Sequence, residues 1–367
     1  MCSGEVIGAE ALLRWQHPEH GLIMPGNFLP AIQGTELEIH VGNWVIEHAL
    51  QQLDKWQQAG IRMEISINIS SHHLQWQGLF EQLDRALARY PKVASNLLQL
   101  EILESSVLGD IHNISSIIKT CRTVLGIRVS LDDFGTGYSS LTHLRHLPVD
   151  VVKIDQSFVR DIIDDPNDYT IVDGVIGLTD AFHHQVIAEG VETVEHGLML
   201  ITMGCKLAQG YIIAHPIPAD QFISWHEQYQ PNQQWLSHAK QNLTAEQTII
   251  HLMQLQGNYW FKSIITNLQA DPDEVDHWPL MNHKKSHFMH WLEQARKQNL
   301  FDKNWLDNLK LAYIELFHEA NTLKYQFQEG QVDMACSGIT GLEERYQTIE
   351  DLITEYRSLG THKTPVM

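Results

Sequence analysis

Short apolar runs alternate with longer amphipathic stretches over the first two-thirds of the chain. In the longer stretches, such as Gly42–Gln58 and Ile111–Leu125, apolar residues recur every three or four positions, which is typical of a helix packed on one face. Alternating strands and helices predict a parallel sheet with crossover helices. The seven predicted strands are Val6–Leu12, Met63–Ile69, Leu97–Leu103, Ile127–Leu131, Asp150–Ile154, Gln185–Ala188 and Lys206–Ala208.

The strand pattern stops near Phe222. Seven strands are one short of a closed (β/α)₈ barrel, so the α/β fold predicted for residues 1–225 is a TIM-like barrel that lacks one strand. Residues 226–244 are rich in Gln, His and Asn and are interpreted as a connector. Residues 245–367 are predicted to form a small all-α bundle. Its helices are expected at Ala245–Ala270, His283–Gln298, Lys303–Gln328 and Glu343–Leu359.

Composition and charge exclude several classes of function. The chain has 367 residues, 43% of them hydrophobic, and a net charge of -20, which argues against wrapping DNA or RNA. An acidic protein can still bind a phosphate ligand when metal ions neutralise it locally. No apolar run reaches the ~18 residues that a membrane span needs. The four cysteines, Cys2, Cys121, Cys205 and Cys336, form no CxxC pair, so reduced thiols in a cytoplasmic protein are expected.

Polar residues gather at the carboxyl ends of the predicted strands, where barrel enzymes place their chemistry. A single buried acid is most often a salt-bridged structural residue, but several at one end repel each other unless cations hold them. Carboxylates with one amide favour Mg²⁺ or Mn²⁺, and adjacent aspartates suit a two-metal site that activates water at a phosphodiester. The candidate residues are Glu10, Asn68, Glu101, Asp132, Asp133, Lys153, Asp155 and Glu189.

Six linked motifs resemble the EAL domain family in order and spacing over about 220 residues. Glu10-Ala11-Leu12 lies within Gly8–Trp15 and is similar to the signature that gives the family its name. The run Asp132-Asp133-Phe134-Gly135-Thr136-Gly137-Tyr138-Ser139-Ser140 is similar to the family's loop after the fifth strand. The other matches are Lys153-Ile154-Asp155, Glu189-Gly190-Val191-Glu192-Thr193, Gln209-Gly210-Tyr211 and Pro216.

The resemblance implies a phosphodiesterase that opens cyclic di-GMP to linear pGpG. It implies that Glu10, Asn68, Glu101 and Asp132 ligate one divalent ion, and that Asp132, Asp133 and Asp155 hold or support a second. Lys153 would contact the attacking water or the scissile phosphate, and Glu189 would act as a general base or a water-mediated metal contact. Arg14 would grip a phosphate, Gln209 would line the site, and Pro216 would lie beside a guanine.

The resemblance also assigns a supporting loop. Glu104 matches the family acid that props the loop Phe134–Ser140, with Gly135, Thr136 and Gly137 at its centre, and that loop would link metal binding to formation of a homodimer. Two departures stand out: Leu103 replaces a usual Thr, and only Met1–Gly4 precede the Glu-Ala-Leu strand. We therefore expect a fragment that lacks the first strand and helix of the barrel, with a possible sensory domain upstream.

The C-terminal part faintly resembles the chemoreceptor zinc-binding domain around Asn282–Leu292. Ser286 stands where that family has a cysteine, and its other ligand positions fall near Gly257, Tyr313 and Phe317. Although His283 and His287 share a helix face, zinc is not expected, and we interpret this part as a regulatory or dimerising module.

Two other functions stay open from the sequence. The barrel could be a receptor that binds cyclic di-GMP without cleaving it, although such a receptor is expected to have lost metal ligands or the lysine. The chain could also serve mainly as an interaction scaffold through its helical C-terminal part.

Overall fold

The computed structural model describes residues 1–107, 111–137 and 140–360, with the backbone alone for residues 107, 140–142 and 357–360. Tyr138 and Ser139 of the predicted supporting loop lie outside the described residues. The chain forms two compact units. The first comprises Met1–Arg160 and Ile171–Leu236, and the second comprises Asp161–Thr170 and Ser237–Met367.

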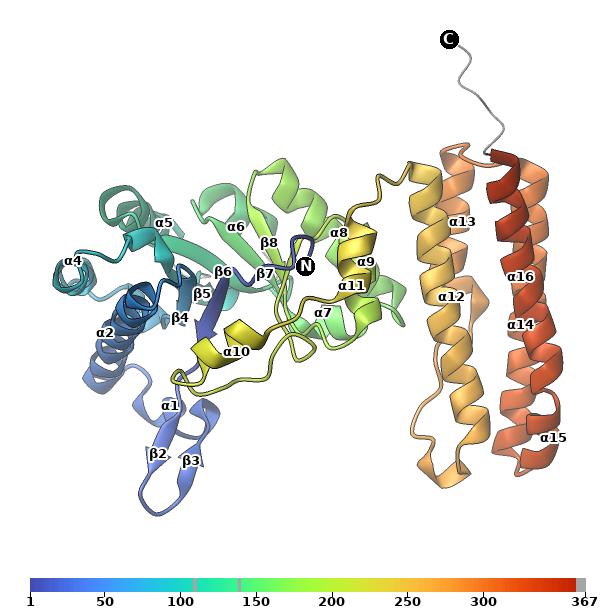
Figure 1. The fold of residues 1–367 in the computed structure, drawn as a ribbon, viewed down its shortest axis with the longest axis horizontal. Helices are drawn as coiled ribbons and strands as arrows, with labels where there is room; N and C mark the ends of the chain where they lie inside the picture. The colour runs from blue at the N-terminus through green and yellow to red at the C-terminus, as the bar shows by residue number, and fades with distance from the viewer. Residues whose placement is uncertain (108–110, 138–139, 361–367) are drawn as a thin grey trace, which may run out of the picture. The chain divides into compact units, whose positions relative to one another are not determined.

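A seven-stranded parallel sheet forms the centre of the first unit (Figure 1). It confirms the predicted architecture, an α/β barrel with one strand fewer than the closed form, and β1 and β9 are its edge strands. In sheet order the strands are β1 Gly8–Ala11, β4 Glu64–Asn68, β5 Leu98–Leu103, β6 Arg128–Phe134, β7 Val151–Ile154, β8 Gln185–Ala188 and β9 Leu207–Ala208.

Side chains of these strands alternate between two environments, as the period of two in a strand requires. In β5, Leu98, Leu100 and Ile102 are all buried at 1% exposure or less. Between them lie Gln99 and Glu101, whose Cα atoms pair with those of Ser66 and Asn68 in β4. The polar positions of neighbouring strands therefore lie in register on one face of the sheet.

Helices and single turns lie between the strands and after the last of them. The first long helix, α2, begins at Glu36, so the predicted start at Gly42 is wrong. Its first turns expose Leu37 and show no apolar face, but the Glu38 carboxylate accepts a hydrogen bond of 2.6 Å from the backbone N–H of Gly34.

The helices are α1 Pro25–Ile32, α2 Glu36–Gln58, α3 Ser71–Leu74, α4 Leu79–Arg89, α5 Ile111–Thr120, α6 Ser140–His146, α7 Gln156–Arg160, α8 Pro166–Ala181, α9 Val194–Thr202, α10 Phe222–Gln228 and α11 Gln233–Ala239. The turns are η1 Ser95–Leu97, η2 Glu104–Val107 and the π-helix η3 Cys121–Leu125.

A small antiparallel hairpin, β2 Trp15–His17 and β3 Gly21–Ile23, was not foreseen from the sequence. Its turn is held by the His17 ring, whose Nδ1 accepts hydrogen bonds from the backbone N–H groups of Glu19 and His20. Gly21 supplies a φ of +68°, which glycine adopts without strain. Strands of three residues are too short to show a period in the sequence.

Long helices build the second unit and confirm the predicted all-α bundle. They are α12 Ala245–Gln269, α13 His287–Lys297, α14 Lys303–Gln328, α15 Val332–Ser337 and α16 Ile339–Gly360, with short turns η4 Pro272–Glu274 and η5 His283–Lys285. The helix expected from His283 begins at His287, because the Ser286 hydroxyl accepts the N–H of Met289 as an N-cap. Thr244 and Gln247 form a capping box at the start of α12.

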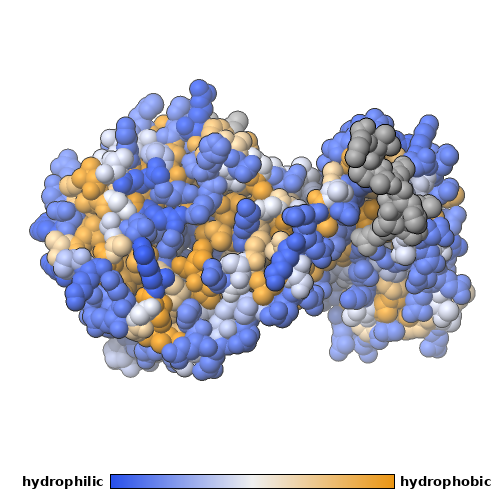
Figure 2. Space-filling view, turned by 45° about the horizontal axis from the view of Figure 1, so that its top comes forward, coloured by the Kyte–Doolittle hydropathy of each residue, from blue (hydrophilic) through white to orange (hydrophobic). Residues whose placement is uncertain are grey.

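Aromatic stacking fills the interior of the bundle. Phe288 and Tyr313 stack with ring centroids 3.9 Å apart, and Trp260 and Phe317 stack at 4.3 Å. Gly257 and Tyr313, two of the positions compared with zinc ligands, line one narrow interior cavity. Hydrophilic residues make up most of the bundle surface outside the grey atoms on the face drawn in Figure 2. Within the described residues, no helix combines the length and apolar character that a bilayer span requires.

Candidate metal and phosphate site

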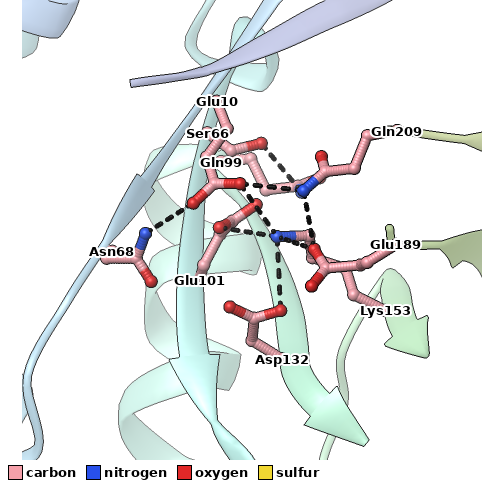
Figure 3. A network of polar contacts seen from close by, with 9 residues as sticks. All are labelled: Glu10, Ser66, Asn68, Gln99, Glu101, Asp132, Lys153, Glu189 and Gln209. Atoms are coloured by element: carbon pink, nitrogen blue, oxygen red, sulfur yellow. Dashed lines mark hydrogen bonds and ion pairs between the residues drawn. The ribbon is translucent and has the colours of Figure 1, made fainter. Parts of the chain in front are cut away.

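Lys153 in β7 is the centre of a buried polar cluster at the carboxyl end of the sheet (Figure 3). Its side chain is 1% exposed, and four carboxylates from separate parts of the sheet surround the ammonium group. Lys153 Nζ lies 2.6 Å from Glu189 Oε1, 2.9 Å from Glu101 Oε2, 3.2 Å from Asp132 Oδ1 and 3.4 Å from Glu10 Oε2. The structure thus brings together residues that are up to 179 positions apart, between Glu10 and Glu189.

Two side-chain amides fix the carboxylates at the edge of the cluster. Asn68 Nδ2, at the end of β4, donates to Glu10 Oε1 at 2.8 Å. Gln209 Nε2, directly after β9, donates to Glu10 Oε2 at 2.9 Å and to Glu189 Oε1 at 2.7 Å. Figure 3 shows Gln209 reaching across to both acids. These bonds hold Glu10 and Glu189 facing the same space as Lys153.

A β-bulge brings the carboxylates of two successive aspartates, Asp132 and Asp133, close together. The register between β6 and β7 shifts between Leu131 and Phe134, and Asp133 has a φ of +53°. Carboxylate oxygens of Asp132, Asp133 and Glu189 lie within 4.8 Å of one another. In a regular strand the side chains of residues 132 and 133 would point to opposite faces, so the bulge is what gathers them.

Burial and mutual repulsion set the protonation of the cluster. Burial raises the pKa of Glu101 to about 8, with Glu10 and Asp132 adding to the shift and Lys153 opposing it. Burial also raises the pKa of Glu189 and Asp133. The pKa of Glu10 is lowered, because Lys153, Gln209 and Asn68 outweigh its own burial.

Lys153 stays charged for the converse reason. Burial alone would lower its pKa, but the carboxylates of Glu101, Glu10, Glu189 and Asp132 together raise the pKa above its ordinary value. One positive charge faces four acids, so the cluster favours a further cation.

The donor set fits a divalent metal. All the converging ligand atoms are oxygens, and the Oε1 atom of Glu101 is buried without a hydrogen-bond partner in the described part of the chain. Buried carboxylate oxygens seldom remain unpaired, so this atom is available to an ion. Oxygen ligands are the kind that Mg²⁺, Mn²⁺ and Ca²⁺ prefer.

Other candidates lie beside the cluster. Asp155 shares a side-chain hydrogen bond with Asp133 and also caps α7, accepting the backbone N–H of Ser157 at 2.8 Å. Arg14 Nη1 donates to the neighbouring carbonyl of Leu13. Pro216 is exposed and directly follows His215, whose ring stacks on that of Tyr211. The contacts of these described residues do not join Arg14 or Pro216 to the cluster.

The sequence reasoning missed the polar layer beneath the acids. Gln99 is 2% exposed, and its Nε2 donates to Ser66 Oγ at 3.3 Å (Figure 3). Ser130 is fully buried on the same face. Each of these residues lies two positions before a candidate ligand, Asn68, Glu101 or Asp132, so strand alternation was the signal that could have found them. His143, a buried partner of Glu104, was missed as well.

Comparison with known proteins agrees with this geometry. Residues 1–216 match the EAL domain. The chain belongs to the EAL domain family. It is 38% identical over 223 residues to the bifunctional diguanylate cyclase/cyclic di-GMP phosphodiesterase MucR of Pseudomonas aeruginosa, covering 60% of this chain and 32% of that protein.

A second relative, the cyclic di-GMP phosphodiesterase PdeR of Escherichia coli, is 38% identical over 226 residues, covering 62% of this chain and 34% of PdeR. The matched part of the chain thus spans about a third of the length of these curated relatives. Among solved structures, the PaMucR phosphodiesterase in complex with c-di-GMP superposes with a TM-score of 0.56 at 38% identity, over 59% of this chain and 87% of that one.

Proposed function

We propose that the EAL domain of this chain hydrolyses cyclic di-GMP to linear pGpG with the help of divalent metal ions. The observation that carries the proposal is the convergence of Glu10, Glu101, Asp132 and Glu189 on Lys153, beside an adjacent Asp133. A cyclic dinucleotide carries two phosphodiester charges, which an acidic site accepts only when cations are present. The names of MucR and PdeR support the choice of substrate.

In this proposal Mg²⁺ or Mn²⁺ would supply an activated water and would neutralise charge on the phosphate. Glu10, Asn68, Glu101 and Asp132 would hold one ion, and Asp132, Asp133 and Asp155 would hold or support the other. Glu189 would take the proton of the attacking water, since its carboxylate lies 2.6 Å from Lys153 Nζ at the centre of the cluster. Lys153 holds the water or the scissile phosphate with its ammonium group. Arg14, Gln209 and Pro216 contact the substrate.

The test is turnover of cyclic di-GMP by the full chain with Mg²⁺ or Mn²⁺, read by chromatography. Asp132→Asn removes a shared ligand and should abolish turnover, whereas Asp84→Asn, at an exposed position of α4, should act like wild type. Turnover of Asp132→Asn within about tenfold of wild type would contradict its role. Binding of cyclic di-GMP without any pGpG would replace the hydrolase with a receptor.

Two finer parts of the proposal have their own tests. Ca²⁺ should inhibit, because its larger radius and looser geometry suit a two-metal phosphodiester site poorly. A homodimer is proposed from the resemblance of the loop around Gly135 and Gly137, and light scattering with and without Mn²⁺ measures it. A monomer under both conditions would remove the dimer from the proposal.

A further inference from the structure

The carboxylate of Glu104 holds the backbone that follows the paired aspartates. Glu104 comes directly after β5 and is fully buried. Its Oε2 atom accepts hydrogen bonds from the backbone N–H of Gly135 at 3.0 Å and of Gly137 at 3.3 Å. A buried carboxylate that accepts backbone N–H groups fixes the position of those groups.

The other oxygen of the same carboxylate faces a histidine. Nδ1 of His143, in α6, lies 3.2 Å from Glu104 Oε1, and the His143 side chain is 3% exposed. The carboxylate is planar, so a donor that fixes Oε1 also fixes the direction of Oε2. His143 therefore sets the orientation in which Glu104 meets the N–H groups of Gly135 and Gly137.

The fit between Glu104 and this backbone is tight. A Cβ atom added at Gly137 would lie 2.8 Å from Glu104 Cδ, and one added at Gly135 would lie 2.9 Å from the ring of Phe158. Gly135 also has a φ of +107°. A turn of the Glu104 carboxylate would therefore displace this backbone.

The same segment is tied directly to the acids. Thr136 Oγ1 donates to the backbone carbonyl of Asp133 at 2.9 Å, and the aspartates lie only two and three residues before Gly135. A displacement of Gly135 and Gly137 would thus be passed to the carboxylates of Asp132 and Asp133.

We propose that His143 is a positioning residue for the metal-binding aspartates, acting through Glu104 and the N–H groups of Gly135 and Gly137. The effect on turnover rests on the proposed phosphodiesterase function. The effect on the backbone and on metal affinity does not.

The test compares two substitutions in the full chain. His143→Leu removes the donor and keeps an apolar side chain in the buried site. His143→Asn keeps a donor at the same distance in bonds from Cβ, because its Nδ2 takes the place of Nδ1. His146→Leu, at an exposed position of the same helix, is the matched control. Should His143→Leu fail to fold, His143→Phe refills the volume of the ring without the donor.

The first readout is hydrogen exchange of the Gly135 and Gly137 amides without metal, and the second is Mn²⁺ affinity from the paramagnetic resonance of free Mn²⁺. Losing a buried hydrogen bond to a charged group should speed exchange and weaken Mn²⁺ binding by about tenfold in His143→Leu. His143→Asn and His146→Leu should stay close to wild type. Wild-type exchange in His143→Leu, or equal losses in the Leu and Asn variants, would overturn the proposal.

A double substitution tests the route through Glu104. In a Glu104→Leu background no polar side-chain atom remains to meet His143 or the glycine N–H groups, so His143→Leu should change exchange and Mn²⁺ affinity little further. Additive effects would show that His143 does not act through Glu104 and would overturn the proposal. Wild-type protein that binds Mn²⁺ without cleaving cyclic di-GMP would contradict the proposed function and leave these comparisons intact.

Discussion

Asp132 and Asp133 are successive residues of β6, yet their carboxylates reach the same cluster of ligand atoms. The bulge and the left-handed backbone of Asp133, with a φ of +53°, make this possible. Aspartate and asparagine tolerate this conformation better than other residues with a Cβ, because their short side chains bond locally. The residue type at position 133 therefore suits both the left-handed backbone and the proposed metal site.

Substitutions at Asp133 should separate the effect of the left-handed backbone from the effect on metal binding. Asp133→Ala places alanine in a left-handed conformation at a cost of about 1 kcal/mol, whereas Asp133→Asn and Asp133→Gly avoid that cost. The melting temperature of the metal-free protein should therefore be lower for Asp133→Ala than for Asp133→Asn or Asp133→Gly. All three variants should bind Mn²⁺ more weakly than wild type. An alanine variant as stable as the glycine variant would argue against strain at this position.

Removing the central ammonium should destabilise the protein most when metal is absent. Lys153→Met leaves four carboxylates facing each other, and loss of one partner from a buried ion cluster costs about 3 kcal/mol. Mn²⁺ should raise the melting temperature of this variant more than that of wild type, while turnover should fall far more than metal affinity. Lys92→Met, at an exposed position, is the control. Equal melting temperatures of Lys153→Met and Lys92→Met without metal would refute the prediction.

Alanine substitutions at two helical glycines should change the free energy of unfolding in opposite directions. A Cβ at Gly197 in α9 would lie 2.2 Å from the Trp235 ring, which is held by a hydrogen bond of 2.9 Å from its Nε1 to the Val194 carbonyl. Gly197→Ala should therefore lower the free energy of unfolding by about 1–3 kcal/mol. A Cβ at Gly174 in α8 meets nothing within 4 Å, so Gly174→Ala should raise it by up to about 1 kcal/mol. Denaturant titration measures both, and the same sign for the two would contradict the packing argument.

The second unit should lose stability in acid through His287. This side chain is 1% exposed, its Nε2 lies 2.9 Å from the Ile162 carbonyl, and burial lowers its pKa to about 4. The carbonyls of Ile162 and Ile163 and the charge of Asp165 oppose that shift, and His290 adds to it. The folded protein keeps the ring neutral while the unfolded chain takes up a proton below its ordinary pKa of 6.5.

Stability from His287 is therefore fully present above pH 6.5 and falls as the pH drops towards 4, by up to about 3 kcal/mol. His287→Phe should flatten this part of the profile, whereas His318→Gln, at an exposed position of α14, should not. Melting temperatures between pH 4 and 7 make the comparison. A parallel profile for His287→Phe and wild type would mean that His287 is not the group responsible.

The strands could be predicted because buried parallel strands leave short apolar runs, and all seven lie within a residue or two of their expected bounds or extend slightly beyond them. The convergence of Glu10, Glu101, Asp132, Lys153 and Glu189 followed from their positions at strand ends, since those ends share one face of a barrel.

What the sequence did not reveal depends on contacts between distant segments. The bulge at Asp133 arises from a register shift against β7, and a local pattern carries no sign of it. His143 lies in a short helix whose polar residues look like a solvated face, and only its proximity to Glu104 makes it a buried partner. The start of α2 was misplaced because its first turns bury little and so show no apolar period.

The Gln209 side chain also links the two edges of the sheet. β1 and β9 are the outermost strands of the sheet, and the described residues form no backbone ladder between them. The Gln209 amide crosses this seam by bonding Glu10 at the β1 edge and Glu189 after β8. In the proposed function an ion bound by Glu10 would hold one of these two carboxylates in place at the same seam. Occupancy of the site would then change how readily the whole barrel opens, because anything that binds only the folded form stabilises all of it.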